Sequence, residues 1–305
     1  MTSVSKSDLP FTLKKKLNVV GEIMKINLDH FSTGYSGKEI LHDLTFEVSS
    51  PGIYVVLGKN GAGKTTLFRS MTGLLKPYSG TIRYNDVELE KSDVKIAYLG
   101  HRDSIPTGLS VENALKFFAR VEGVPDESIN DVIERFGLKK FLGQSYLNLS
   151  QGQRRRVSLA KSLLGEKELM ILDEPTSGLD PKISSEIREL MKQESKDRII
   201  LYSSHNLYEA TDIGSEVIAI SEGKILYAGE MSGLSAGHYR IGIRGAGIED
   251  VTSNYTKDGK YYVFDLKSQD EAADLVSRLT SSGAKLYEVR DISNTLERFY
   301  DESKE

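Results

Sequence analysis

Short apolar runs recur along the chain and indicate buried strands. Residues 52–57, 169–172 and 199–202 are almost entirely apolar. Runs of this length without polar alternation are typical of strands buried on both faces of a parallel sheet. Helical patterns lie between them, such as 126–136, where Ile129, Val132, Ile133 and Phe136 fall on one face. The pattern therefore predicts an α/β fold.

A second set of segments alternates between apolar and polar residues. Residues 24–31, 41–48 and 80–84 do so, as expected of strands with one buried face. We expect them to form an antiparallel layer beside the phosphate-binding stretch described below, with Tyr35 in a loop between the first two strands. From about 103 to 160 the pattern is mostly helical, which predicts a helical insertion within the α/β domain.

The pattern divides the chain into three parts. Residues 1–23 are polar with few apolar positions, and we expect a disordered extension. Residues 24–232 form the main domain, and the Ser/Gly-rich stretch 232–237 is typical of a linker. Residues 233–305 are predicted to form a small α+β accessory domain. Its expected strands are 239–243, 261–266 and 285–289, and its expected helices are 269–279 and 293–300.

Composition narrows the possible functions. The 305 residues are 39% hydrophobic and 28% charged, with a formal net charge of −4, so we expect no general affinity for nucleic acid. There is no cysteine, which excludes disulfides and suits a reducing compartment. No apolar run approaches the length of a membrane span, so we expect any membrane role to come through a partner.

One stretch carries a recognisable chemistry. After the predicted strand 52–57 the sequence continues as Gly58-Lys59-Asn60-Gly61-Ala62-Gly63-Lys64-Thr65-Thr66. Glycines let backbone N–H groups turn toward phosphate oxygens, and the start of the following helix adds its positive dipole end. Lys64 can reach the β and γ phosphates, and the Thr65 hydroxyl can bind Mg²⁺. This stretch predicts a site that binds the phosphates of a nucleotide together with Mg²⁺.

Two further features follow predicted strands. Asp173 and Glu174 come directly after 169–172, and His205 follows 199–202. Because ligands bind at the carboxyl ends of parallel strands, these side chains can meet at one nucleotide. An Asp in this position can hold Mg²⁺, and the adjacent Glu can activate the attacking water.

At these positions the chain resembles the ATP-binding cassette family over about residues 24–232. Gly58–Thr66 is similar to its Walker A motif, 169–174 to Walker B with the catalytic glutamate, and 175–180 to the D-loop. Residues 149–153, Leu-Ser-Gln-Gly-Gln, resemble the L-S-G-G-Q signature with Gln151 in place of Gly. The resemblance implies a cassette with a mixed sheet core, an antiparallel β subdomain and a helical subdomain.

The resemblance also assigns roles to individual residues. The catalytic residues would be Glu174, His205 as the switch histidine, and Lys64. The metal would be held by Thr65, Asp173 and His101. The nucleotide would contact Tyr35, stacked on adenine, and Gly58, Asn60, Gly61, Ala62, Gly63, Lys64, Thr65, Thr66, Ser150, Gly152 and Gln153.

The signature forms a second anion site at the start of a predicted helix, where Ser150 and Gly152 offer a hydroxyl and backbone N–H groups. Two half-sites that cannot meet within one chain favour head-to-tail pairing about a two-fold axis. The resemblance implies this arrangement, with ATP between Walker A of one subunit and the signature of the other. We expect Arg154, Arg155 and Arg156 to form a mostly solvated face, with one arginine near the catalytic loops as the minority alternative.

The chain departs from the family at one sensor position. His101 stands where the family has a glutamine that touches Mg²⁺ and senses the membrane partner. Since Mg²⁺ prefers oxygen ligands, our hypothesis is that His101 keeps the sensor place with weaker metal contact.

By resemblance, the chain is the ATPase subunit of a transporter with a separate integral membrane subunit, at the inner face of the cell membrane. Residues 73–77 and 296–300 are similar to export-type ATPases of the multidrug or sodium exporter group, although 296–300 could equally be a helix that packs on its own domain. A soluble cassette ATPase of iron–sulfur cluster assembly remains an alternative function. Both a homodimer and a heterodimer of cassette subunits remain open as the assembled form. Glu174 argues against a purely regulatory nucleotide-binding module.

Overall fold

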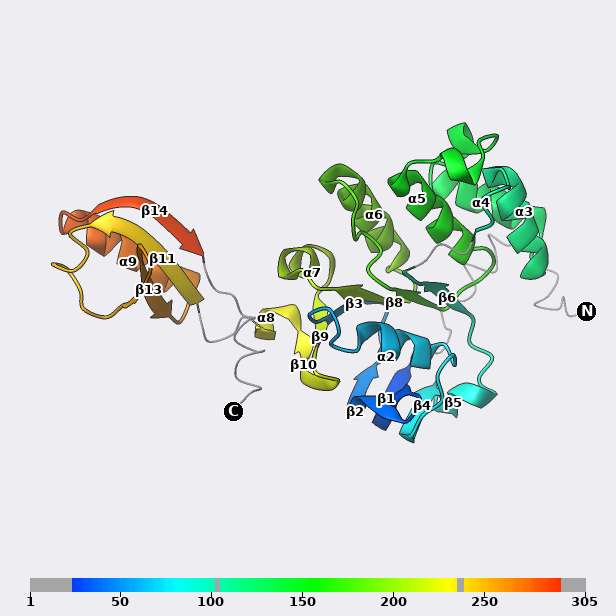
Figure 1. Ribbon diagram of the computed structural model, residues 1–305, viewed down its shortest axis with the longest axis horizontal. Helices are drawn as coiled ribbons and strands as arrows, with labels where there is room; N and C mark the ends of the chain where they lie inside the picture. Colours follow the sequence, from blue (N-terminus) through cyan, green and yellow to red (C-terminus); the bar gives the residue numbers. More distant parts are fainter. Residues whose placement is uncertain (1–23, 102–104, 235–238, 292–305) are drawn as a thin grey trace, which may run out of the picture.

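The computed structural model describes residues 24–101, 105–234 and 239–291. In these residues the strands form three sheets (Figure 1). The largest has six strands in the order β10-β9-β3-β8-β7-β6. Its strands are β3 (Gly52–Leu57), β6 (Ile96–Leu99), β7 (Leu169–Leu172), β8 (Ile199–Ser204), β9 (Glu216–Ser221) and β10 (Lys224–Glu230). All neighbours pair in parallel except β9 and β10, so the carboxyl ends of β3, β7 and β8 share one edge.

A four-stranded antiparallel sheet lies beside this core in the order β2-β1-β4-β5. Its strands are β1 (Ile26–Tyr35), β2 (Lys38–Val48), β4 (Ser79–Tyr84) and β5 (Val87–Glu88). Helix α2 (Lys64–Met71) packs between the two sheets, since Leu67, Phe68 and Met71 belong to one core cluster with residues of both.

Three helices contact the opposite face of the central sheet: α5 (Gln151–Ser162), α6 (Pro181–Glu194) and α7 (Leu207–Ile213). Helices α3 (Val111–Val121) and α4 (Asp126–Arg135) pack against each other and against α5. Single 3-10 turns occur at η3 (Leu89–Lys91), η4 (Lys139–Phe141) and η5 (Tyr146–Asn148). Side-chain caps fix several helix starts: the Ser110 hydroxyl accepts the N–H of Asn113, and the Asp180 carboxylate accepts that of Ile183.

The last described part of the chain begins with the short helix α8 (Met231–Leu234) and continues as a separate sheet. This sheet has the order β12-β13-β11-β14, and α9 covers one of its faces through a cluster that includes Ile243, Phe264 and Leu279. The elements are β11 (Tyr239–Ala246), β12 (Thr256–Asp258), β13 (Tyr261–Leu266), α9 (Gln269–Ser281) and β14 (Lys285–Asp291).

The predicted α/β cassette architecture with an antiparallel layer and a helical part is confirmed. The prediction that Tyr35 lies in a loop is wrong. Tyr35 ends β1 and pairs with Lys38, so β1 and β2 are joined by a tight turn at Ser36 and Gly37, both with positive φ. The predicted linker begins as helix α8. The predictions for 1–23 and for a helix at 293–300 lie outside the described residues.

Within the described ranges, none of the helices combines the length and apolarity needed to cross a lipid bilayer.

Candidate functional site

The phosphate-loop residues lie between β3 and α2, where close packing requires glycine. A Cβ at Gly63 would lie 2.6 Å from Leu41 Cδ2, and one at Gly58 would lie 2.6 Å from the Ile220 carbonyl oxygen. Gly61 and Gly63 have φ of 87° and 109°, a region that favours glycine. Gly63 is also the N-cap of α2 and provides no side-chain cap, so the first-turn N–H groups are left for an anion.

Lys64 lies inside this loop. Its ammonium donates to the carbonyl oxygens of Gly58 at 2.7 Å and Lys59 at 3.2 Å, and only 5% of its side chain is exposed. The loop is therefore wound around a positive charge that can meet phosphate oxygens. Asn60 and Gly61 at its tip are exposed, whereas Ala62 and Thr66 are buried.

The expected metal ligands Thr65 and Asp173 are brought together. The Thr65 hydroxyl donates to Asp173 Oδ2 at 2.7 Å, and Ser203 Oγ donates to Asp173 Oδ1 at 2.8 Å. A hydroxyl and a carboxylate are oxygen ligands of the kind that Mg²⁺ prefers, so the pair fits this ion. No group of three or more His, Asp or Glu side chains in the described ranges is arranged to hold a metal. A Mg²⁺ here would depend on Thr65, Asp173, water and phosphate oxygens.

Glu174 lies where three basic side chains meet. Its Oε1 is 3.4 Å from Lys64 Nζ and 3.3 Å from His205 Nδ1, and its Oε2 is 3.8 Å from His101 Nε2. Burial raises the pKa of the Glu174 carboxyl, but Lys64 and His205 outweigh this effect and hold the pKa below its ordinary value. Glu174 is therefore ionised at neutral pH and can accept a proton or orient water.

The backbone at Glu174 is in an unusual conformation, with φ of 44°. For a non-glycine residue this conformation costs on the order of 1 kcal/mol or more. The Glu174 N–H donates to Ser203 Oγ at 2.9 Å, so the hydroxyl that holds Asp173 also fixes the next residue. Ser203 is not among the residues predicted from the sequence, although it lies near the end of β8, the strand next to the one that precedes Asp173.

Arg155 is the second residue that sequence reasoning misplaced. The expectation of a solvated face fails here because Arg155 is only 9% exposed. Its guanidinium donates at 2.8–3.0 Å to the carbonyls of Gly100, Asp173, Glu174 and Pro175. The minority alternative, an arginine at the catalytic loops, is therefore correct for this residue.

A signal for Arg155 was present in the sequence. Arg155 lies four positions before Leu159 and seven before Ser162, both buried, and so shares the inward face of α5. The two arginines adjacent in sequence make other contacts: Arg154 Nε donates to the Leu149 carbonyl at 3.0 Å, and Arg156 pairs with Glu186.

The signature residues lie at the start of α5, away from the phosphate loop. Figure 1 places α5 and α2 on opposite faces of the central sheet, in agreement with their separate core clusters. Ser150 and Gln153 form a reciprocal capping box, in which each side chain accepts the other residue's N–H. Ser150 is exposed, and a Cβ at Gly152 would lie 2.8 Å from Ile183 Cγ2. The structure thus leaves the Ser150 turn accessible to a neighbouring molecule.

Two expected residues lie at the edges of the site. Tyr35 is 37% exposed, and its hydroxyl accepts a hydrogen bond from Arg69 Nη1 at 3.2 Å. His101 follows β6 and contacts Glu174. Adenine stacking on Tyr35 and metal contact by His101 remain predictions.

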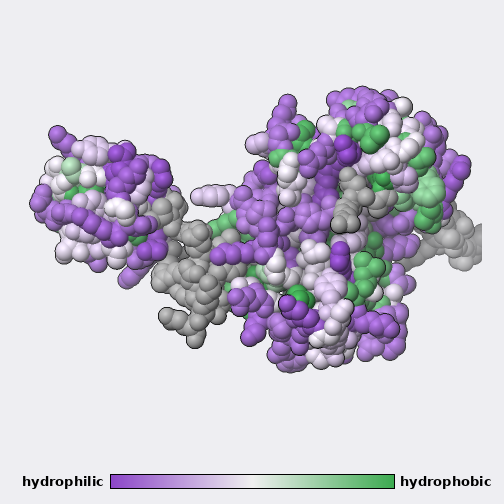
Figure 2. Space-filling view, in the orientation of Figure 1, coloured by the Kyte–Doolittle hydropathy of each residue, from purple (hydrophilic) through white to green (hydrophobic). Residues whose placement is uncertain are grey.

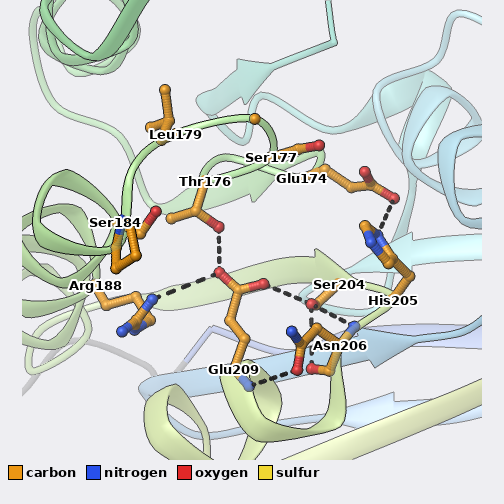
Figure 3. A pocket seen from close by; sticks show the side chains of 12 residues that line it. Glu174, Thr176, Ser177, Leu179, Ser184, Arg188, Ser204, His205, Asn206 and Glu209 are labelled. Carbon is orange, nitrogen blue, oxygen red and sulfur yellow. Dashed lines mark hydrogen bonds and ion pairs between the residues drawn. The ribbon is translucent and has the colours of Figure 1, made fainter.

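A cleft of about 350 Å³ runs between Glu174 and His205 on one side and α6 and α7 on the other (Figure 3). Loop 175–180 forms its wall, with Thr176, Ser177, Gly178 and Leu179 lining it. Glu174 and His205 are the two site residues that line this cleft, whereas the phosphate loop and Asp173 lie outside its lining.

Residues 41–177 match the ABC transporter family. The chain is 33% identical over 208 residues to the cytochrome c biogenesis ATP-binding export protein CcmA of Cupriavidus pinatubonensis (strain JMP 134 / LMG 1197), covering 66% of this chain and 90% of that protein. It is 32% identical over 221 residues to the mouse ABC-type organic anion transporter ABCA8B, but this match spans only 14% of that protein. Among solved structures, cbiO1 from Clostridium perfringens, part of the ABC transporter complex cbiONQ, matches with a TM-score of 0.62 and 26% identity, covering 68% of this chain and 89% of that chain.

The fold and these matches define an ATPase of the phosphate-loop class. The chain belongs to the ABC transporter family as one of its ATP-binding proteins.

Proposed function

We propose that this chain is the nucleotide-binding subunit of an ABC exporter. Two cassettes close head to tail around two Mg-ATP, and hydrolysis reopens them to drive a separate integral membrane subunit. The observation that carries the proposal is the setting of Glu174, an ionised carboxylate beside Lys64 and His205 and one residue from the Thr65–Asp173 pair. The position of each of these side chains past a strand end matches a role in splitting ATP.

Each residue has a defined part in the reaction. Lys64 neutralises charge on the β and γ phosphates, and His205 positions the γ-phosphate. Glu174 orients the attacking water and accepts its proton. A Mg²⁺ held by Thr65 and Asp173 would neutralise further charge on the phosphates. Arg155 holds the backbone carbonyls of Asp173 and Glu174, and Ser203 holds the Asp173 carboxylate and the Glu174 N–H.

Head-to-tail closure follows from the separation of the two half-sites. The exposed Ser150 turn begins α5 and the phosphate loop begins α2, and these helices lie on opposite sides of the central sheet, so we infer that a second subunit brings its Ser150 to the nucleotide. Either a second copy of this chain or a related cassette can fill that place.

An exposed apolar surface supports a membrane partner. On α3, Phe117 is 49% and Val121 66% exposed, and elsewhere in the helical part Leu147 is 59% exposed. Figure 2 shows hydrophobic residues gathered over this helical part of the molecule. Exposed apolar patches of this kind mark interaction sites. We place the subunit on the cytoplasmic face of the cell membrane, docked through this surface, and propose that residues 233–305 form an accessory domain.

Export is the direction we propose, since CcmA is an export protein by name. Co-purification from membranes tests the partner: an integral membrane subunit supports the proposal, and a soluble iron–sulfur scaffold in its place contradicts it.

The variant Glu174→Gln tests the enzymatic part. It should bind ATP, hydrolyse little, and elute as a dimer with ATP in size-exclusion chromatography. Elution of Glu174→Gln as a monomer at saturating Mg-ATP would refute head-to-tail closure.

A further inference from the structure

A mostly buried carboxylate outside the reacting groups joins the loop after Glu174 to the end of the strand before His205. Glu209, on α7, has a side chain only 16% exposed. Its Oε1 accepts hydrogen bonds from the hydroxyls of Thr176 and, at 2.8 Å, Tyr202, and its Oε2 accepts one from Ser204 at 2.6 Å. We call this arrangement the hydroxyl bridge; Figure 3 shows its contacts with Thr176 and Ser204.

The hydroxyl bridge is well buried. Thr176, Tyr202 and Ser204 are 7%, 0% and 2% exposed. The nearest guanidinium, Arg188 Nη1, is 3.9 Å from Glu209, whereas Arg188 Nε donates to Asp212 at 2.6 Å. The charge of Glu209 is therefore stabilised mainly by hydroxyl donors. Removing a carboxylate from water costs free energy. We therefore expect Glu209 to serve a purpose other than stability, namely to hold Thr176 and Ser204 in fixed positions.

The two ends of the hydroxyl bridge lie next to the catalytic groups. Thr176 is two residues past Glu174 in loop 175–180, whose tip at Ser177 and Gly178 is exposed in the cleft. Ser204 directly precedes His205. A further bond, from the Glu209 N–H to Asn206 Oδ1 at 3.2 Å, fixes the residue on the other side of His205. The side chain of Glu209 thus touches loop 175–180 through Thr176 and the end of β8 through Ser204.

We propose that Glu209 is a positioning residue that couples loop 175–180 to His205. When the neighbouring subunit displaces the exposed tip at Ser177 and Gly178, Thr176 shifts the Glu209 carboxylate, which moves Ser204 and with it His205. Hydrolysis is then completed only when the loop is docked. The catalytic consequence rests on the proposed function, whereas the coupling within one chain does not.

The first test uses nucleotide-free protein and so does not depend on closure. The chain has five histidines, so the ring signals of ¹⁵N-labelled histidine can be assigned by single substitutions. Glu209→Ala should shift the His205 ring signals, and Thr176→Val should shift them in the same direction. The matched control is Asp212→Asn, which removes a carboxylate from the same helix and from Arg188 but leaves the hydroxyl bridge intact.

The second test measures steady-state ATP hydrolysis. We expect Glu209→Ala to lower kcat by about 10- to 100-fold, the order expected for a misplaced reacting group, with little change in KM. Glu209→Gln should fall between it and the wild type, because the amide can keep part of the bridge. The effects of Thr176→Val and Ser204→Ala on kcat should be non-additive in the wild type and additive in Glu209→Ala.

Two results overturn the inference: an unchanged kcat in Glu209→Ala, or a lower kcat with unmoved His205 signals, which would indicate a merely structural role. If the wild type fails to hydrolyse ATP, the proposed function falls while the histidine signals still decide whether the coupling exists.

Discussion

Removing the Arg155 guanidinium should disorder the catalytic loops. In Arg155→Ala, four carbonyl oxygens, those of Gly100, Asp173, Glu174 and Pro175, lose a charged donor. A buried acceptor left without a partner costs about 1–3 kcal/mol. Water that enters the vacated space can bond to some of these oxygens and so offsets part of the summed cost of the four. We therefore expect a loss of about 3 kcal/mol in the free energy of unfolding.

The assay combines thermal unfolding with ATP hydrolysis. A loss of about 3 kcal/mol corresponds to a Tm lowered by about 6–12 °C in a domain of this size. The kcat should fall on the order of 100-fold at temperatures where the variant is still folded, because Asp173 and Glu174 lose their backbone support.

Arg154→Ala is the matched control. Arg154 is the neighbouring arginine, whose side chain donates to the Leu149 carbonyl, and the loss of this bond should cost about 1 kcal/mol. Arg155→Lys should restore part of the stability, because an ammonium can reach some but not all four carbonyls. If Arg155→Ala and Arg154→Ala lost equal stability and activity, the assigned role of Arg155 would be refuted.

Three further predictions concern the same cleft. Ser203→Ala removes the hydroxyl shared by Asp173 Oδ1 and the Glu174 N–H, and should lower kcat about 10-fold and stability by about 1–2 kcal/mol; unchanged values would contradict this. His101→Gln should keep or raise ATP hydrolysis stimulated by the membrane partner, and a His101→Ala variant with unaltered hydrolysis and coupling would make the position a bystander. Because the pKa of Glu174 lies below its ordinary value of 4.5, its carboxylate adds stability at neutral pH that is lost as the pH falls through the lowered pKa. The stability difference between wild type and Glu174→Gln, measured by urea unfolding, should therefore shrink between about pH 6 and pH 3, and a constant difference would contradict the assigned contacts.

Sequence reasoning located the strands of the core because their apolar character is continuous over each strand. Residues 52–57, 169–172 and 199–202 all lie in the central sheet, and the phosphate loop, Glu174 and His205 follow strand ends as expected. The contacts among Lys64, Glu174 and His205 depend on the order of the strands, because β8 lies between β3 and β7 and pairs with both. Periodicity alone could not supply this order.

The residues that sequence reasoning missed act through contacts between distant segments. Arg155 and Ser203 hold backbone groups 18 to 55 positions away, and Glu209 reaches 33 positions back to Thr176. A local pattern shows that a polar residue lies on a buried face, but its partner is set by the fold. The tight turn after Tyr35 was missed for a different reason, because a Ser-Gly pair suits a loop and a turn equally well.

The most direct test is whether the Ser150 turn of one subunit meets the phosphate loop of another when ATP is bound. Because the chain has no cysteine, a variant carrying Asn60→Cys and Gln151→Cys in the Glu174→Gln background has only these two thiols. Both positions are exposed, one in the phosphate loop and the other next to Ser150. A covalent dimer that forms under mild oxidation with Mg-ATP, and not without it, is the predicted result. Equal cross-linking with and without Mg-ATP, or none in either case, would contradict the account.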